Sequence, residues 1–235
     1  MKTTYAPFDV AEYLDNDAEY LTATLEDANP QEGTEDDSPA MSPCIQGCHH
    51  PAMNYEAAPD FFQKVRLNPA PAAQALTLLI LCASRLSEIL GMRWDEIDIA
   101  AATWTLPPER QKKTGVAHII PLSREALKIL EEITKFRTQS EYVFPGRSWR
   151  KPISGQPLRD LMPPGATLHG WRSTFRDWAG DEAGVPREIA EGALAHLIGN
   201  PVERSYRRRT ALERRRVVME EWSAFLLTKQ DIGIV

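Results

Sequence analysis

The chain has 235 residues, of which 43% are hydrophobic and 26% are charged, a composition typical of a globular protein with one or two domains. This composition excludes a collagen-like, a wholly disordered or a disulfide-scaffold protein. The longest apolar run, residues 76–83, is too short to cross a bilayer, and no basic segment leads into an apolar core near the amino terminus. We therefore expect a cytoplasmic protein that has no membrane partner.

The net charge of −6 is distributed unevenly along the chain. Residues 1–60 contain one basic and thirteen acidic residues, whereas the rest contains 26 Lys and Arg against 20 Asp and Glu. Seven arginines lie between Arg204 and Arg216. A local positive field of this kind suits a nucleic acid, because it is the local field that steers an anionic partner. A solvated, salt-bridged helix face explains the same charges, and charge alone favours that simpler explanation.

Residues 1–48 are predicted to form an acidic, partly disordered segment and linker, and residues 49–235 a separate domain. Within the first segment, glycine, prolines and the acidic run at residues 35–37 leave too few apolar side chains for a core. Cys44 and Cys48 precede two histidines, as in some zinc sites, but no second ligand pair occurs at a usual spacing. We expect reduced thiols and no metal, with Cys82 as a small core residue.

The pattern after residue 57 predicts a mainly helical domain with a small antiparallel β-sheet, an α+β fold. Residues 71–90 have apolar residues at helical spacing and are predicted to form one buried helix that ends at Gly91. Residues 97–106 and 116–122 are predicted as two strands joined through a turn at residues 112–115. Further helices are predicted at residues 58–65, 167–183, 186–196, 202–209 and 211–227, and one more is capped by Ser123.

Several polar residues stand where this pattern predicts burial. Arg85 follows an apolar helix and needs an anionic partner there, which Glu88, three residues on, can provide. His169 and Arg172 are also three residues apart and share one face of a helix. Taken singly, each has a structural explanation: a buried ion pair, a histidine at a helix start and a surface arginine.

Taken together, these residues belong to five segments that carry a specific resemblance. The segments are ASRLSEILGMRW at residues 83–94, KTGVAHIIPLS at 113–123, HGWRSTFRDW at 169–178, LAH at 194–196 and SYRR at 205–208. In this order they resemble the catalytic domain of the tyrosine recombinases, in particular the phage-type integrases. The resemblance covers residues 50–227, about three quarters of the chain.

The resemblance implies an enzyme that cuts and rejoins DNA strands. Arg85 and Arg172 would clamp the scissile phosphate, which suits guanidinium groups because they bind phosphate oxygens in pairs. Tyr206 would attack the phosphorus and form a 3′-phosphotyrosyl link. Because tyrosine normally has a pKa near 10, it needs a proton acceptor, and His169 is the expected acid-base partner.

The remaining roles follow from the same resemblance. His196 would hydrogen-bond the phosphate, and Lys113 would protonate the departing 5′-hydroxyl. Arg207, Arg208 and Arg209 would bind backbone phosphates beside the nucleophile, whereas residues 214–216 could equally form a solvated helix face. The family implies double-stranded DNA as partner, a tetramer at synapsis and accessory proteins that bend DNA, with no metal or other cofactor.

The amino-terminal part departs from the family pattern. The helical core-binding domain that usually precedes the catalytic domain does not fit into the first fifty residues, and residues 5–28 resemble the start of addiction-module antidote proteins. Residues 153–168 are also shorter than the usual connection. We therefore expect a truncated integrase, and the alternative is a catalytically silent remnant that only binds DNA or integrase oligomers. His118, Trp171, Phe175 and Trp178 are expected to be structural.

Overall fold

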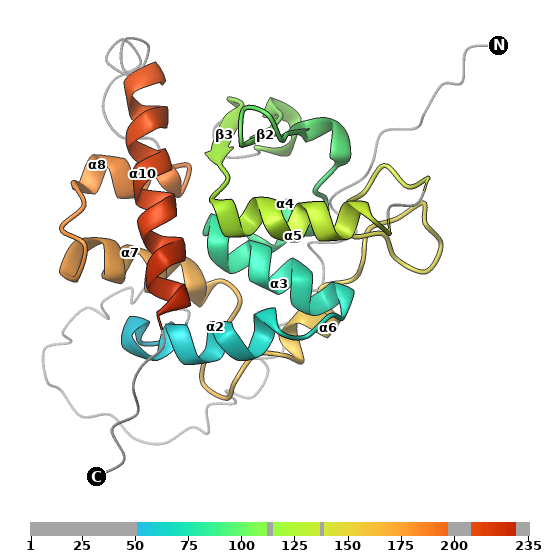
Figure 1. Cartoon of the computed structure of the whole chain (residues 1–235), viewed down its shortest axis with the longest axis horizontal. Coiled ribbons are helices and arrows are strands. Elements are labelled where there is room, and N and C mark those ends of the chain that lie inside the picture. Colours follow the sequence, from blue (N-terminus) through green and yellow to red (C-terminus); the bar gives the residue numbers. More distant parts are fainter. Residues whose placement is uncertain (1–50, 112–114, 137–138, 197–207, 229–235) are drawn as a thin grey trace, which may run out of the picture. The chain divides into compact units, whose positions relative to one another are not determined.

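A buried helix, α3 (Pro71–Cys82), organises the fold. The computed structural model describes residues 51–111, 115–136, 139–196 and 208–228, which all lie within one compact unit, residues 48–235. Nine of the twelve residues of α3 are buried, because the helix is apolar on nearly every face. Around it pack α2 (Ala58–Arg66), α5 (Arg124–Thr134) and α6 (Gln156–Arg159), as Figure 1 shows.

The helix expected over residues 71–90 is broken, and that expectation is therefore corrected. The helix α3 ends at Cys82, and Ala83 turns into the left-handed region with φ 46°. The backbone N–H of Ser84 then donates to the carbonyl of Leu79 at 3.2 Å, which closes a Schellman motif. A second helix, α4 (Leu86–Leu90), follows and is capped by Gly91.

The sheet has three antiparallel strands in the order β1 (Ile97–Asp98), β2 (Thr103–Leu106) and β3 (His118–Pro121). The single strand expected over residues 97–106 is thus two strands, because a tight turn interrupts it. In that turn the side chain of Asp98 accepts from the N–H of Ala101 at 2.8 Å, and Ala102 has φ 51°. Trp104 pairs with Ile120 in the middle of the sheet, and both side chains are buried.

The carboxyl-terminal half adds α7 (Gly170–Asp181), α8 (Arg187–Ala193) and α10 (Arg208–Leu227). In Figure 1, α10 runs between the α7–α8 pair and strand β3, and its end reaches α2. Trp222 on α10 is fully buried, donates its indole N–H to the carbonyl of Ile80 at 2.9 Å, and stacks on Phe225. The expectation that Trp171, Phe175 and Trp178 belong to the core is confirmed.

Short single turns complete the domain. These are the 3-10 helices η1 (Tyr55–Ala57), η2 (Trp94–Glu96) and η3 (Pro108–Arg110). Cys82 is buried as expected, and burial raises the pKa of its thiol to about 12. Within the described ranges no helix is long and apolar enough to span a membrane. The predicted linker, the resemblance at residues 5–28 and the Cys44–His50 cluster lie outside these ranges.

The start of α7 is fixed by the chain segment that leads into the domain. The carbonyl of Pro51 accepts from the backbone N–H of Thr167 at 3.1 Å, and the hydroxyl of Thr167 in turn accepts from the N–H of Gly170 at 3.0 Å. One turn later, the hydroxyl of Thr174 donates to the carbonyl of Met53 at 2.7 Å. A Cβ on Gly170 would lie only 2.2 Å from the carbonyl oxygen of Pro51, so the backbones of these two residues are in direct contact.

This close approach predicts opposite effects for two glycines of the same helix. Gly170→Ala should lower the free energy of unfolding by about 1–3 kcal/mol, because the new methyl group displaces residues 51 and 52. Gly180→Ala should be neutral or stabilise by up to about 1 kcal/mol, because nothing lies within 4 Å of its Cβ position and alanine favours the helix. Urea denaturation of both variants measures the difference. Equal stability of the two variants would contradict the described packing.

Candidate active site

Four of the residues singled out from the sequence line one cavity of about 150 Å³. Arg85 comes from the start of α4, His169 and Arg172 from the start of α7, and His196 from the chain just after α8. Ser173, Arg176 and Leu194 complete the lining. Residues separated by more than 100 positions in sequence are thus brought together at one point of the domain.

The buried guanidinium of Arg172 is held by two backbone carbonyls. Its Nη1 donates to the carbonyl of Ala83 at 2.8 Å, and its Nη2 donates to the carbonyl of Leu194 at 2.6 Å. The residue is only 6% exposed, so these two bonds replace most of its contact with water. The planar fork of the side chain is therefore fixed in direction.

Both carbonyls lie where a helix ends on a left-handed alanine. The helix α8 stops at Ala193, earlier than the expected span of residues 186–196, because Ala195 has φ 56°. The N–H of His196 then donates to the carbonyl of Glu191 at 2.9 Å, the same Schellman bond that ends α3 beyond Ala83. Each left-handed alanine costs about 1 kcal/mol. Arg172 binds the carbonyl of Ala83 itself and the carbonyl of Leu194, which precedes Ala195.

Arg85 is held by Glu88 in the geometry expected from their spacing. Its Nη1 donates to Oε1 of Glu88 at 2.7 Å, and its backbone N–H donates to Oε2 at 2.8 Å. The side-chain amide of Gln111 donates to the same carboxylate at 3.1 Å. Burial opposes ionisation of Glu88, but the hydrogen bonds and charge of Arg85 outweigh it and lower the pKa of this carboxyl.

Glu191 was not singled out from the sequence, yet it contacts the site directly. This buried carboxylate of α8 lies 2.5 Å from Nδ1 of His196 through Oε2, and 2.9 Å from Nε of Arg176 through Oε1. The other ring nitrogen of His196, Nε2, lies 3.3 Å from Nη2 of Arg172. The sequence pattern does not indicate this contact, because Glu191 and His196 are five positions apart. That spacing does not place two residues on the same face of a helix.

The site carries an excess of positive charge. Among the described residues at the cavity, three guanidinium groups (Arg85, Arg172, Arg176) face two bonded carboxylates (Glu88, Glu191). Burial, and then the charge of Arg85, lower the pKa of Arg172 to about 10. An anion placed between Arg85 and Arg172 would relieve this repulsion. The cavity is therefore suited to a small, strongly hydrogen-bonding anion such as a phosphate.

Five further residues predicted for the site belong to the turn expected at residues 112–115 and to the chain around Tyr206. Lys113, Tyr206 and Arg207 lie outside the described residues, and Arg208 and Arg209 form the start of α10. Farther along α10, the guanidinium of Arg215 donates to the carbonyl of Ile119 at 2.8 Å, and that of Arg216 donates to the carbonyl of Ala102 at 3.1 Å. These two arginines join α10 to the sheet region, a role not foreseen from the sequence.

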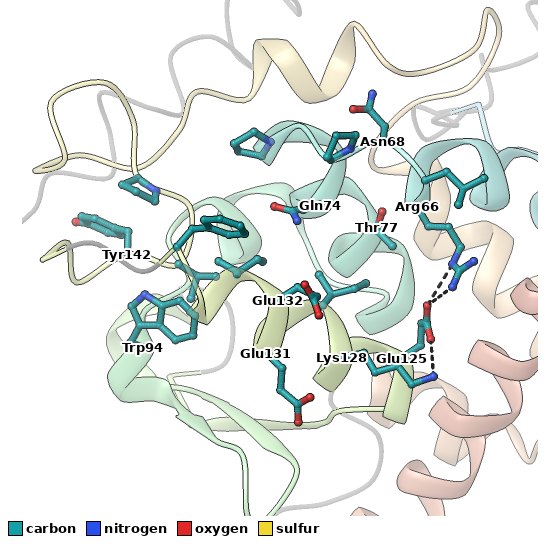
Figure 2. A pocket seen from close by; sticks show the side chains of 18 of the residues that line it. Arg66, Asn68, Gln74, Thr77, Trp94, Glu125, Lys128, Glu131, Glu132 and Tyr142 are labelled. Atoms are coloured by element: carbon teal, nitrogen blue, oxygen red, sulfur yellow. Dashed lines mark hydrogen bonds and ion pairs between the residues drawn. The ribbon is translucent and has the colours of Figure 1, made fainter.

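A larger cavity of about 850 Å³ lies elsewhere, between α3, α5 and residues 142–149. Figure 2 shows three of its charged side chains paired with one another: Glu125 accepts from Arg66 at 2.7 Å and from Lys128 at 3.3 Å. No residue of the small cavity lines it. Where the structure describes side chains, no group of three or more His, Cys, Asp or Glu is arranged to hold a metal ion.

The sequence agrees with the family model described as "Phage integrase family" over residues 53–178. This match covers more than half of the chain and includes Arg85, His169 and Arg172. The chain belongs to the phage integrase family. The integrase match ends before His196, which joins the same cavity in space.

Two prophage integrases of Escherichia coli K12 illustrate the relationship. This integrase-family chain is 36% identical to IntA over 162 residues, which are 66% of the chain and 38% of IntA. It is 32% identical to IntZ over 181 residues, which are 74% of the chain and 44% of IntZ. The chain therefore spans less than half the length of either relative.

Solved structures support the fold. The integrase of mycobacterium phage Brujita superimposes with a TM-score of 0.54 at 16% identity, over 94% of this chain and 71% of that one. The XerA recombinase gives a TM-score of 0.51 at 13% identity, over 87% and 76% of the two chains. The predicted fold, a mainly helical tyrosine recombinase catalytic domain with a small antiparallel sheet, is confirmed.

His118 on β3 should make the stability of this integrase domain depend on pH. Burial, and then the nearby charge of Arg215, lower the pKa of His118 to about 4. The unfolded chain takes up this proton near pH 6.5, whereas the folded protein resists it until about pH 4. Stability should therefore fall as the pH decreases from 6.5 to 4, by up to about 3 kcal/mol from this group.

Denaturation by urea between pH 7 and 4.5 measures this contribution against the His118→Asn variant. Other groups titrate equally in both proteins, so the difference isolates His118. The loss of stability on acidification should be smaller in the variant. An identical pH dependence of the two proteins would show that His118 does not titrate as described.

Proposed function

We propose that this chain carries the catalytic centre of a site-specific DNA recombinase, an integrase that cuts and rejoins DNA strands through a phosphotyrosyl intermediate. The observation that carries the proposal is the convergence of Arg85, His169, Arg172 and His196 on one positively charged cavity. Membership of the phage integrase family supports the same reaction class. Double-stranded DNA is the proposed substrate.

In the first step, the Tyr206 oxygen attacks the scissile phosphorus, and the bond from phosphorus to the 5′-oxygen breaks. The tyrosine proton passes to His169, and Lys113 gives a proton to the departing 5′-hydroxyl. Arg85 and Arg172 neutralise the charge that develops on the non-bridging oxygens. Attack by a 5′-hydroxyl on the phosphotyrosine reverses these bond changes and rejoins the strand.

The partners follow from this chemistry. The phosphotyrosyl bond conserves the energy of the broken phosphodiester, so the step as written uses no nucleotide and no metal. Arg207, Arg208 and Arg209 would contact backbone phosphates next to Tyr206. Exchange between two duplexes needs four cleaved strands, which suits a tetramer at synapsis, with proteins that bend DNA as possible accessories.

Covalent trapping on nicked duplexes tests the nucleophile. The full chain is incubated in EDTA with random-sequence suicide substrates, whose short cleaved fragment diffuses away and leaves protein attached to DNA. The wild type and the Tyr55→Phe control should give a band resistant to SDS, whereas Tyr206→Phe should give none. Tyr55 is a suitable control because its ring contacts the ring of Phe225 and does not line the cavity.

The outcomes separate the two functions considered. If the Tyr206→Phe variant still forms the adduct, Tyr206 is not the nucleophile. Folded wild-type protein that binds DNA without any adduct would instead support a silent integrase remnant. Sequencing of the trapped DNA identifies the cleaved sites if the proposal holds.

The buried arginine gives a second, quantitative test. Arg172→Lys keeps the charge but loses the fork that binds the carbonyls of Ala83 and Leu194 together with a phosphate. The rate of adduct formation should fall by about 100- to 1,000-fold, as for the loss of one oriented donor to a developing anion. The control Arg124→Lys lies on α5 with its side chain 88% exposed, and should keep the wild-type rate. Equal rates for both variants would remove Arg172 from the phosphate site.

A further inference from the structure

The carboxylate of Glu191 and the ring of His196 form a pair that none of the five family-like segments accounts for. Oε2 of Glu191 lies 2.5 Å from Nδ1 of His196, and the carboxylate is buried whereas the ring is half exposed at the cavity. The pair is joined by backbone as well, because the N–H of His196 donates to the carbonyl of Glu191 at 2.9 Å. One hydrogen bond thus joins the two side chains, and a second one joins the backbones of the same two residues.

The neighbours of His196 determine which ring nitrogen carries the proton. Burial opposes ionisation of Glu191, but the hydrogen bond from His196 and the charge of Arg176 outweigh it and hold the pKa of Glu191 below its usual value. An ionised carboxylate only accepts, so Nδ1 must donate. The guanidinium of Arg172 only donates, so Nε2, 3.3 Å from its Nη2, must accept.

We propose that Glu191 is a positioning residue that holds His196 as the Nδ1-protonated tautomer and aims Nε2 at Arg172 and the cavity. This inference rests on the proposed function for its catalytic consequence, although the tautomer itself does not. To donate to a phosphate oxygen, Nε2 must take up a proton from solvent, and Nδ1 of the resulting imidazolium still donates to Glu191. A carboxylate orients a catalytic histidine through Nδ1 in the same way in the Ser-His-Asp triads of acyl-transfer enzymes.

Arg176 keeps the second oxygen of Glu191 occupied. Its Nε forms an ion pair with Oε1 at 2.9 Å, while Oε2 contacts Nδ1 of His196. The two oxygens therefore have separate partners, and the carboxylate cannot rotate without losing both. This arrangement supplies a matched control, because removal of Arg176 breaks one bond of Glu191 and leaves the other.

Nitrogen NMR of protein labelled with ¹⁵N-histidine reads the tautomer without any DNA. The chain has five histidines, and the signal of His196 is assigned by its loss in His196→Gln. At a pH at which the ring is neutral, the wild type should show protonated Nδ1 and unprotonated Nε2. Glu191→Leu, which keeps the side-chain bulk, should lose this single tautomer, whereas Arg176→Gln should keep it. A wild-type ring with its proton on Nε2, or an unchanged tautomer in Glu191→Leu, overturns the proposal.

Adduct formation on the suicide duplexes then tests the catalytic consequence. Glu191→Leu should lower the rate constant at saturating DNA by about 10- to 100-fold, a typical effect of removing the partner of a functional histidine. The affinity for DNA should not decrease, because every arginine of the cavity is retained. A wild-type rate in Glu191→Leu would overturn the positioning role. If the wild type forms no adduct but shows the expected tautomer, the proposed function fails and the assignment of Glu191 stands.

Discussion

The buried guanidinium of Arg172 is the interaction on which the site depends. Isolated burial of such a charge costs several kcal/mol, and the cost is offset only if each side of the fork finds a hydrogen-bond acceptor. The carbonyls of Ala83 and Leu194 are those acceptors, and they come from the ends of two different helices. One side chain therefore ties α3, α7 and α8 together at the cavity. Stability of the domain and geometry of the site share this contact.

The sequence predicted most of the elements, because α2, α5 and α7 have apolar residues at helical spacing. The boundary predicted at residue 210, between two helices, was wrong, because α10 runs through it. It did not predict the break after Cys82 or the early end of α8. Both breaks depend on an alanine in the left-handed region, and alanine gives no local signal for that conformation, unlike glycine. Tertiary contacts with the guanidinium of Arg172 favour these breaks, and such contacts are invisible to periodicity.

Some contacts of the site could be predicted from the sequence and others could not. Arg85 and Glu88 could be predicted as a pair, because residues three positions apart are neighbours in the first turn of a helix, here α4. Glu191 escaped notice because its contact with His196 exists only after the chain reverses at Ala195. The motifs indicated the family and predicted roles for the arginines, whereas the contact between Glu191 and His196 depends on how the chain folds.

The hydrogen bonds made by residues 51–53 connect the first described residues of the domain to the helix that carries His169 and Arg172. Pro51 accepts from Thr167, two residues before His169, and Met53 accepts from Thr174, five residues after it. The bare backbone of Gly170 lies directly against this segment. A rotation of the backbone at Pro51 would move the start of α7, because the backbones of Pro51 and Gly170 are in direct contact with no side chain between them. A displacement of residues 51–53 would therefore also displace His169 and Arg172.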